Sequence, residues 1–108
     1  MLNFKTKIMK KVEVSYVIVR SSKAGVFFGQ LVNKINNEVT LNNCRKLYYW
    51  AGACAIEQIA IDGIIKKYQK DCKFTVNVEN ATILDVIQII PCTTKSITSI
   101  QSIPIWKL

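Results

Sequence analysis

The stretch VEVSYVIVRSSKAGVFFGQLVNKINNEVTLNN, residues 12–43, decides the fold, because it predicts three strands joined by short turns. In its first part, β-branched and aromatic residues alternate with other residues, as in a half-buried strand. A polar segment containing Gly25 makes the first turn. Asn36-Asn37 is typical of a tight hairpin, because asparagine tolerates a positive φ. The expected strands cover residues 12–20, 26–34 and 38–43.

The downstream residues predict helices and two further strands. The helical spacing of apolar residues after Trp50 ends at Gly63, which suits a helix C-cap. Threonines at 93 and 94 can cap a second helix that Pro104 ends, and Trp106 follows as a packing anchor. The expected elements are a helix over 53–62, a wet connection over 64–72, a fourth strand over 74–78, a buried fifth strand over 83–90 and a short helix after residue 93. We therefore predict an α+β fold, with a small antiparallel sheet of about five strands and two helices packed on it.

Length and charge limit the class of protein. A chain of 108 residues, half of them hydrophobic, is expected to form one folded domain. We predict a basic flexible leader at residues 1–11 and a single α+β domain over 12–108, which is completed by oligomerisation. The formal net charge is +8, and the lysines of the leader carry about half of it. The leader fits a solvated tail or an arm for nucleic acid or membrane. No segment has the pattern of a secretory signal or a membrane span, so we expect a cytosolic chain without a membrane partner.

Residue types that usually carry catalysis or bind metals are scarce. The chain has no histidine, its acidic residues lie singly, and its cysteines form no C-x-x-C pair. Metal sites need clustered ligands, and a nucleophilic serine or cysteine usually needs a histidine as its base. We therefore expect no enzymatic activity, no cofactor and no metal ion, and we interpret the cysteines as buried thiols.

The segment LNNCRKLYYWAGA, residues 41–53, holds the most informative side chains. Its amides and adjacent cations can hold phosphates and hydroxyls, and its consecutive aromatics can stack bases. If the segment is extended, each of its sides carries a cation and an aromatic ring, because neighbouring residues point to opposite faces. The composition suggests recognition of an anionic, ringed molecule such as a nucleotide. Alternatively, the aromatics pack in the core or in a subunit interface, while Arg45 and Lys46 face water.

Two loops are further candidate anion sites. Arg20 precedes a turn that holds Lys23 and Gly25, and backbone amides around a glycine can form an anion-binding concavity. Thr94 and Lys95 lie at a predicted helix N-terminus, which also favours anions. An ordinary hairpin turn and a plain N-cap explain the same two loops without a ligand.

Six motifs follow one another along the chain: YVIVR-SSKAGVFFG, LNNCRKLYYWAGA, QIAIDG, KFTV, IIPCT and SIPIW. This pattern resembles the Thoeris anti-defence family of small phage and prophage proteins, the first-described phage sponges of that bacterial immune system. The resemblance runs from about Tyr16 to Trp106 and leaves out the basic leader.

The resemblance implies a non-enzymatic function. Members of that family bind and sequester cyclic ADP-ribose-type signals made by bacterial TIR-domain proteins, and they leave the molecule intact. Some members also hold cyclic di- or trinucleotides of the related CBASS defence at separate pockets. They assemble as dimers that build up into hexamers, with pockets at subunit contacts. The expected place of action is the host bacterial cytoplasm.

Residue chemistry and the resemblance together nominate ten ligand-binding residues. The cations are expected at phosphates, the aromatics at stacked rings, and Asn43 and Thr94 at ribose or base edges. Some family members use arginines near the C-terminus. This chain has none after Arg45, so Lys95 or Lys107 would have to replace them, without the planar fork of a guanidinium. The ten residues are Arg20, Lys23, Phe27, Asn43, Arg45, Lys46, Tyr48, Trp50, Thr94 and Lys95.

A second hypothesis follows from charge alone. A basic chain can bind nucleic acid or an acidic protein and could inhibit another defence system in that way. Its affinity for nucleic acid would then fall steeply with salt. Specific recognition of a nucleic-acid sequence is not expected.

Overall fold

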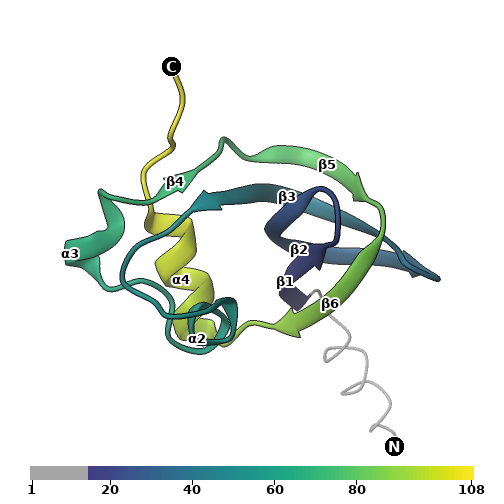
Figure 1. The fold of residues 1–108 in the computed structure, drawn as a ribbon, viewed down its shortest axis with the longest axis horizontal. Coiled ribbons are helices and arrows are strands. Elements are labelled where there is room, and N and C mark those ends of the chain that lie inside the picture. The colour runs from purple at the N-terminus through teal and green to yellow at the C-terminus, as the bar shows by residue number, and fades with distance from the viewer. Residues whose placement is uncertain (1–14) are drawn as a thin grey trace, which may run out of the picture.

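The computed structural model describes residues 15–108, and within this range the chain forms a six-stranded sheet and three helices (Figure 1). The strands are β1 (Ser15–Ser21), β2 (Gly25–Ile35), β3 (Glu38–Tyr49), β4 (Lys73–Phe74), β5 (Val78–Ile83) and β6 (Val86–Pro91). The helices are α2 (Ile56–Asp62), α3 (Lys66–Gln69) and α4 (Thr94–Ser102). The predicted α+β class is confirmed, and the predicted leader at residues 1–11 lies outside the described residues. No helix within residues 15–108 is long and apolar enough to cross a membrane.

The sheet is antiparallel and curls on itself. Its strand order is β4-β3-β2-β1-β6, and β5 pairs with β3. Although β5 and β6 lie toward opposite edges of this order, only Leu84 and Asp85 join them, so the two edges must come together (Figure 1). Hydrogen bonds from the end of β1 stabilise the connection between β5 and β6. Ser21 Oγ donates to the Leu84 carbonyl at 2.7 Å, and the Ser22 amide donates to the Asp85 carbonyl at 3.0 Å.

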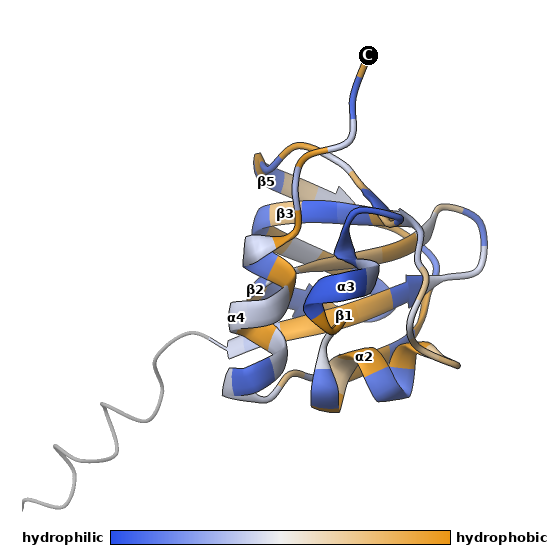
Figure 2. Ribbon diagram, turned by 90° about the vertical axis from the view of Figure 1, so that its left-hand side faces the viewer, coloured by the Kyte–Doolittle hydropathy of each residue, from blue (hydrophilic) through white to orange (hydrophobic). Residues whose placement is uncertain are grey.

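The two faces of the curled sheet bury separate hydrophobic cores. The first core lies between the sheet and the helices, which gather on one side of the strands in Figure 2. It includes Ile18, Phe28, Leu47, Ile56, Ile59, Ile64, Phe74, Ile100 and Ile103. The second core lies on the inner face of the curl and is formed by strands. It comprises Val17, Val19, Val39, Leu41, Cys44, Ile83 and Val86, with Phe27, Leu31, Ala81 and Ile89 packed against it.

The predicted third strand is too short, because β3 continues to Tyr49. The polar pair Asn42 and Asn43 suggested a strand end, but both side chains are satisfied across the sheet. Asn42 Oδ1 accepts a hydrogen bond from Asn80 at 2.8 Å, and Asn43 Nδ2 donates to Gln30 at 3.2 Å. A register shift in the β2–β3 pairing and a φ of 51° at Asn43 mark a β-bulge at this point.

Other element boundaries also differ from the prediction. The predicted wet connection over 64–72 contains the short helix α3, and the region predicted as one fourth strand holds β4 and the start of β5. The last strand begins at Val86, because the turn at Leu84 and Asp85, where Asp85 has a φ of 54°, interrupts the apolar run. The N-cap of the last helix is confirmed, since Thr93 Oγ1 accepts from the Ser96 amide at 3.1 Å.

Candidate functional site

The bulge at Asn43 sets the direction of every side chain that follows it in β3. Before the bulge, Leu41 faces the second core, and after it Cys44 still does. Arg45 therefore points toward the helices, with Leu47 in the first core, and Lys46 points to the opposite face. The two adjacent cations thus have different environments.

Arg45 lies in the interior of the fold with a relative exposure of 2%. Its guanidinium donates to the backbone carbonyls of Thr75 and Ile100 at 2.8 Å, of Phe74 at 3.2 Å and of Pro104 at 3.3 Å. Burial lowers the pKa of the guanidinium from its usual value, but four carbonyl acceptors offset the loss of water. From the sequence, Arg45 was predicted to bind a phosphate. This prediction is wrong, because the guanidinium donates its hydrogen bonds to backbone carbonyls around β4 and the end of α4.

Lys46 and Tyr48 belong to a surface that we call the aromatic–lysine row. The Lys46 Nζ atom lies 5.8 Å from the centre of the Phe27 ring, on the neighbouring strand β2. Tyr48 is 60% exposed and stacks on the indole of Trp106, with ring centroids 5.1 Å apart and planes inclined by 11°. The Lys73 Nζ atom lies 5.5 Å from the centre of the Trp106 ring. The row consists of Phe27, Lys46, Tyr48, Trp106 and Lys73.

Lys73 and Trp106 were not among the sequence-predicted ligand-binding residues. Trp106 was expected as a packing anchor, and it does pack, but on the exposed Tyr48 and with 39% of its own surface accessible. Its position depends on the first core, because the Trp106 amide donates to the Phe74 carbonyl at 2.9 Å and Ile105 forms a bridge to Phe74. The sequence carries no local signal that brings residues 48, 73 and 106 together.

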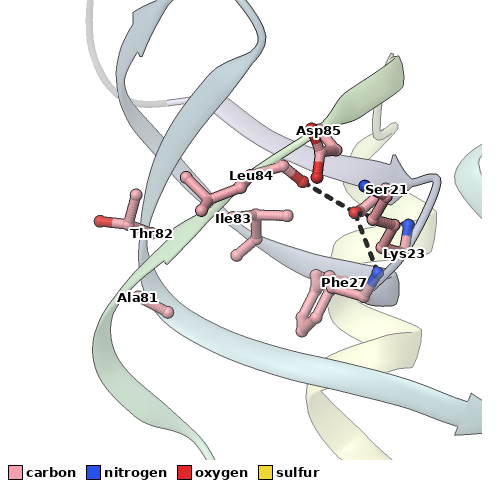
Figure 3. A pocket seen from close by; sticks show the side chains of 9 residues that line it. Ser21, Lys23, Phe27, Ala81, Thr82, Ile83, Leu84 and Asp85 are labelled. Carbon is pink, nitrogen blue, oxygen red and sulfur yellow. Dashed lines mark hydrogen bonds between the residues drawn. The ribbon is translucent and has the colours of Figure 1, made fainter.

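A cavity of about 410 Å³ opens beside the Phe27 end of the row (Figure 3). It lies between the turn that follows β1 and the end of β5. Most of its wall is apolar, and the charged groups on it are Lys23 and Asp85. The lining residues are Ser21, Lys23, Ala24, Phe27, Ala81, Thr82, Ile83, Leu84 and Asp85. The structure thus brings together Lys23, Phe27 and Lys46 of the sequence-predicted residues, with Tyr48 next along β3.

The turn beside this cavity is held by a side chain. Ser21 Oγ accepts from the amides of Lys23 at 3.2 Å and Ala24 at 3.0 Å. These amides already have an acceptor, so the predicted concavity of free backbone amides is not what the turn presents. The Lys23 side chain is exposed and remains the group that could meet an anion there.

Three predicted residues lie on other parts of the fold. Arg20 is close to Glu57. The pKa of Glu57 is lowered mainly by a hydrogen bond from the Gln88 side chain and by a hydrogen bond to the Glu57 backbone, and the charge of Arg20 lowers it further. Thr94 and Lys95 lie at the start of α4, whereas Trp106 follows its other end, and Lys95 pairs with Asp62 at 3.7 Å.

Two further predicted residues belong to the framework beside the row. Trp50 follows the last residue of β3 and packs against the first core, so its ring is half-buried. Asn43 forms the bulge and bonds to Gln30. Asn43 thus bends the strand that carries Lys46 and Tyr48, and Trp50 anchors the end of that strand on the first core.

Cys44, Cys72 and Cys92 are not poised as nucleophiles, whereas Cys54 is exposed, so the prediction of buried thiols is wrong for Cys54. Burial raises the pKa of the Cys44 thiol to about 11, and the pKa of Cys92 is also about 11, mainly through burial. The pKa of Cys72 is raised by the same cause. Because the reactive species is the thiolate, these three groups are inert at neutral pH.

The fold and the surface together define a small α+β domain with an exposed aromatic and cationic face and an adjoining apolar cavity. A model of DUF6948, a domain of unknown function, matches residues 14–100, and the chain therefore belongs to this family. Comparison with curated proteins and with solved structures finds no match to the chain. The matched range includes Phe27, Lys46, Tyr48 and Lys73, whereas Trp106 follows it.

Proposed function

We propose that the chain binds a nucleotide-type ligand at the aromatic–lysine row and holds it without chemical change. The observation that supports this most strongly is the exposed Tyr48–Trp106 stack with Lys46 and Lys73 beside it. An aromatic face can stack a base at about 1–3 kcal/mol per base, and lysine ammonium groups attract phosphate. The row therefore offers the two chemistries that a nucleotide needs, with Lys46 and Tyr48 on the same face of β3.

The more specific proposal is sequestration of a cyclic ADP-ribose-type signal in the host bacterial cytoplasm, which would inhibit Thoeris immunity. It is supported by the resemblance to the Thoeris anti-defence family, and cyclic di- or trinucleotides of CBASS are further candidate ligands. A sponge must compete with a receptor, and a Kd of 1 nM corresponds to about −12 kcal/mol. A half-open surface with one or two stacked rings supplies less than this. We therefore propose that a second copy of the chain closes over the row in a dimer or hexamer.

Ligand capture followed by mass spectrometry tests this function. Purified protein is incubated with cyclic ADP-ribose, separated from free ligand and heat-denatured, and the released molecule is weighed. We expect intact ligand from the wild-type chain and at least tenfold less from Tyr48→Ala and Lys46→Ala. Lys67→Ala is the matched control, because Lys67 also lies over a tyrosine ring, that of Tyr68, but on α3. Release of a changed molecule would indicate an enzyme, and equal capture by all variants would place the site elsewhere.

Binding of single-stranded nucleic acid is the second candidate function. It is favoured by the net charge of +8 and by the arrangement of rings and lysines along one strand face. This function predicts an affinity for an oligonucleotide that falls steeply with salt. If capture of cyclic ADP-ribose fails while a salt-sensitive oligonucleotide complex forms at the row, this second function replaces the first.

A further inference from the structure

We infer that the cavity beside Phe27 seats the ring of the ligand, and that Asp85 selects rings that present an N–H donor. This inference rests on the proposed function, because it assigns the cavity to the same nucleotide that the row binds. It goes further in naming the group that distinguishes one base from another. The ligand class is a nucleotide whose base carries an amino group, as adenine does.

The size and lining of the cavity suit an aromatic ring. A volume of about 410 Å³ lies within the usual range of about 300–1,000 Å³ for small-molecule sites. Phe27, Ala81, Ile83 and Leu84 give it an apolar wall, and Figure 3 shows these side chains around one hollow. The Phe27 ring belongs both to this wall and to the row, since Lys46 lies over it. A ring in the cavity would therefore leave its phosphate near Lys46.

Few polar groups remain free inside the cavity. Ser21 Oγ is occupied by the Leu84 carbonyl and by two amides of its own turn. The Thr82 hydroxyl lies 3.5 Å from the Thr40 hydroxyl, so the two can share a hydrogen bond. Within residues 15–108, neither Lys23 nor Asp85 forms an ion pair. The cavity thus presents one cationic donor and one carboxylate acceptor to a ligand.

The carboxylate gives the cavity its selectivity. An ionised carboxylate accepts hydrogen bonds and donates none, and it repels phosphate. The phosphate of a ligand is therefore expected at the lysines, and a ring N–H or amino group at Asp85. Asp85 is exposed at the rim of the cavity, so a ring that offers only acceptors would lose a hydrogen bond to the carboxylate and is expected to bind more weakly than a ring with an amino group.

Two variants separate the cavity from the row. Ala81→Leu fills part of the hollow with an apolar side chain. Asp85→Asn keeps the shape and can donate as well as accept, and asparagine tolerates the positive φ of 54° at this position. The probes are ADP, purine riboside 5′-diphosphate, which lacks the amino group, and inorganic pyrophosphate, which lacks a ring. Isothermal titration gives the Kd values, and melting temperatures show that each variant is folded.

We expect the wild-type chain to bind ADP at least tenfold more tightly than the riboside analogue. Asp85→Asn should reduce this ratio to about one, and Ala81→Leu should weaken ADP at least tenfold while leaving pyrophosphate unchanged. If ADP binding depends on Lys46 and Tyr48 but is unaffected by both cavity variants, the cavity assignment is wrong and the row remains. If neither ADP nor its analogue binds the wild-type chain while cyclic ADP-ribose is captured, this inference is wrong and the proposed function stands. If cyclic ADP-ribose is not captured either, both are wrong.

Discussion

Replacing Arg45 and Lys46 one at a time by methionine separates a structural cation from a ligand-binding one. The two residues are adjacent and both were assigned to phosphates from the sequence. In the structure Arg45 is buried, whereas Lys46 lies on the aromatic–lysine row. We expect Arg45→Met to lower stability strongly, and Lys46→Met to lower ligand affinity without a stability cost.

The magnitude for Arg45→Met follows from its carbonyl acceptors. A hydrogen bond that involves a charged group contributes about 1.5–3 kcal/mol. The carbonyls of Thr75 and Pro104 are partly accessible, so water can replace the guanidinium there. Those of Ile100 and Phe74 are buried, and at the lower limit the two bonds to them contribute about 3 kcal/mol together.

Two effects moderate this loss. The Ile100 and Phe74 carbonyls each keep a backbone donor, from Ile103 at 3.2 Å and Trp106 at 2.9 Å. Methionine also removes the cost of burying a charge and preserves much of the packing on Phe74. We therefore expect a decrease of about 2–4 kcal/mol in the free energy of unfolding, which corresponds to a decrease of about 10–25 °C in Tm for a domain of this size. Lys46→Met, at a half-exposed position, should change stability by less than about 0.5 kcal/mol.

Urea denaturation followed by tryptophan fluorescence measures the stabilities, and titration with ADP measures the affinities. Full stability in Arg45→Met together with lost binding would refute the structural role of Arg45. Unchanged affinity in Lys46→Met would remove the row from the proposed site. Arg45→Lys adds a check, because a single ammonium cannot reach four carbonyls in a planar fork and should not restore stability.

Four further predictions address other parts of the chain. Gly63→Ala should lower the free energy of unfolding by about 2 kcal/mol or more in chemical denaturation, because Gly63 has a φ of +71° and a Cβ there would collide with Ser99. Alkylation at pH 8, followed by peptide mass spectrometry, should modify the exposed Cys54 first and Cys44 and Cys92 last. Cys44 and Cys92 have pKa values of about 11 in the folded chain and about 9 as ordinary thiols, so these thiols lose their protons at lower pH in the unfolded chain. The free energy of unfolding should therefore fall between about pH 9 and pH 11. The fall should be smaller in a variant with both cysteines replaced by alanine. Deleting the basic leader should leave ADP affinity intact and weaken salt-sensitive binding of an oligonucleotide, as measured by fluorescence anisotropy.

The sequence predicts those elements whose signals are local. Alternation of apolar residues predicts β1 and β2, and Asn36 takes up the positive φ that its hairpin needs. Gly63 and Thr93 delimit helices through their own backbone and side-chain chemistry. The length of β3 is not local in this sense, because its second half is stabilised by pairing with β2 and with β4, which is more than twenty residues away.

The candidate site could be predicted only in part, for the same reason. Composition identifies the segment that carries Lys46 and Tyr48, but alternation alone cannot say which side of it is buried. The bulge at Asn43 decides this, and it depends on the register with Gly29 and Gln30 in the neighbouring strand. Trp106 joins the site through contacts with Tyr48, Lys73 and Phe74, which lie more than thirty residues earlier in the chain, so no spacing in the sequence indicates it.

The buried cation and the exposed stack are parts of one arrangement. Arg45 binds carbonyls of β4, of the end of α4 and of Pro104, and thereby fixes the segment that leads to Trp106. Tyr48, three residues further along the same strand, stacks on the indole ring of Trp106 in that segment. A core residue of β3 therefore determines the geometry of a surface on its opposite face. Loss of ligand binding in a destabilised Arg45 variant would consequently not identify Arg45 as a ligand, whereas loss in Lys46→Met at full stability identifies Lys46 as one.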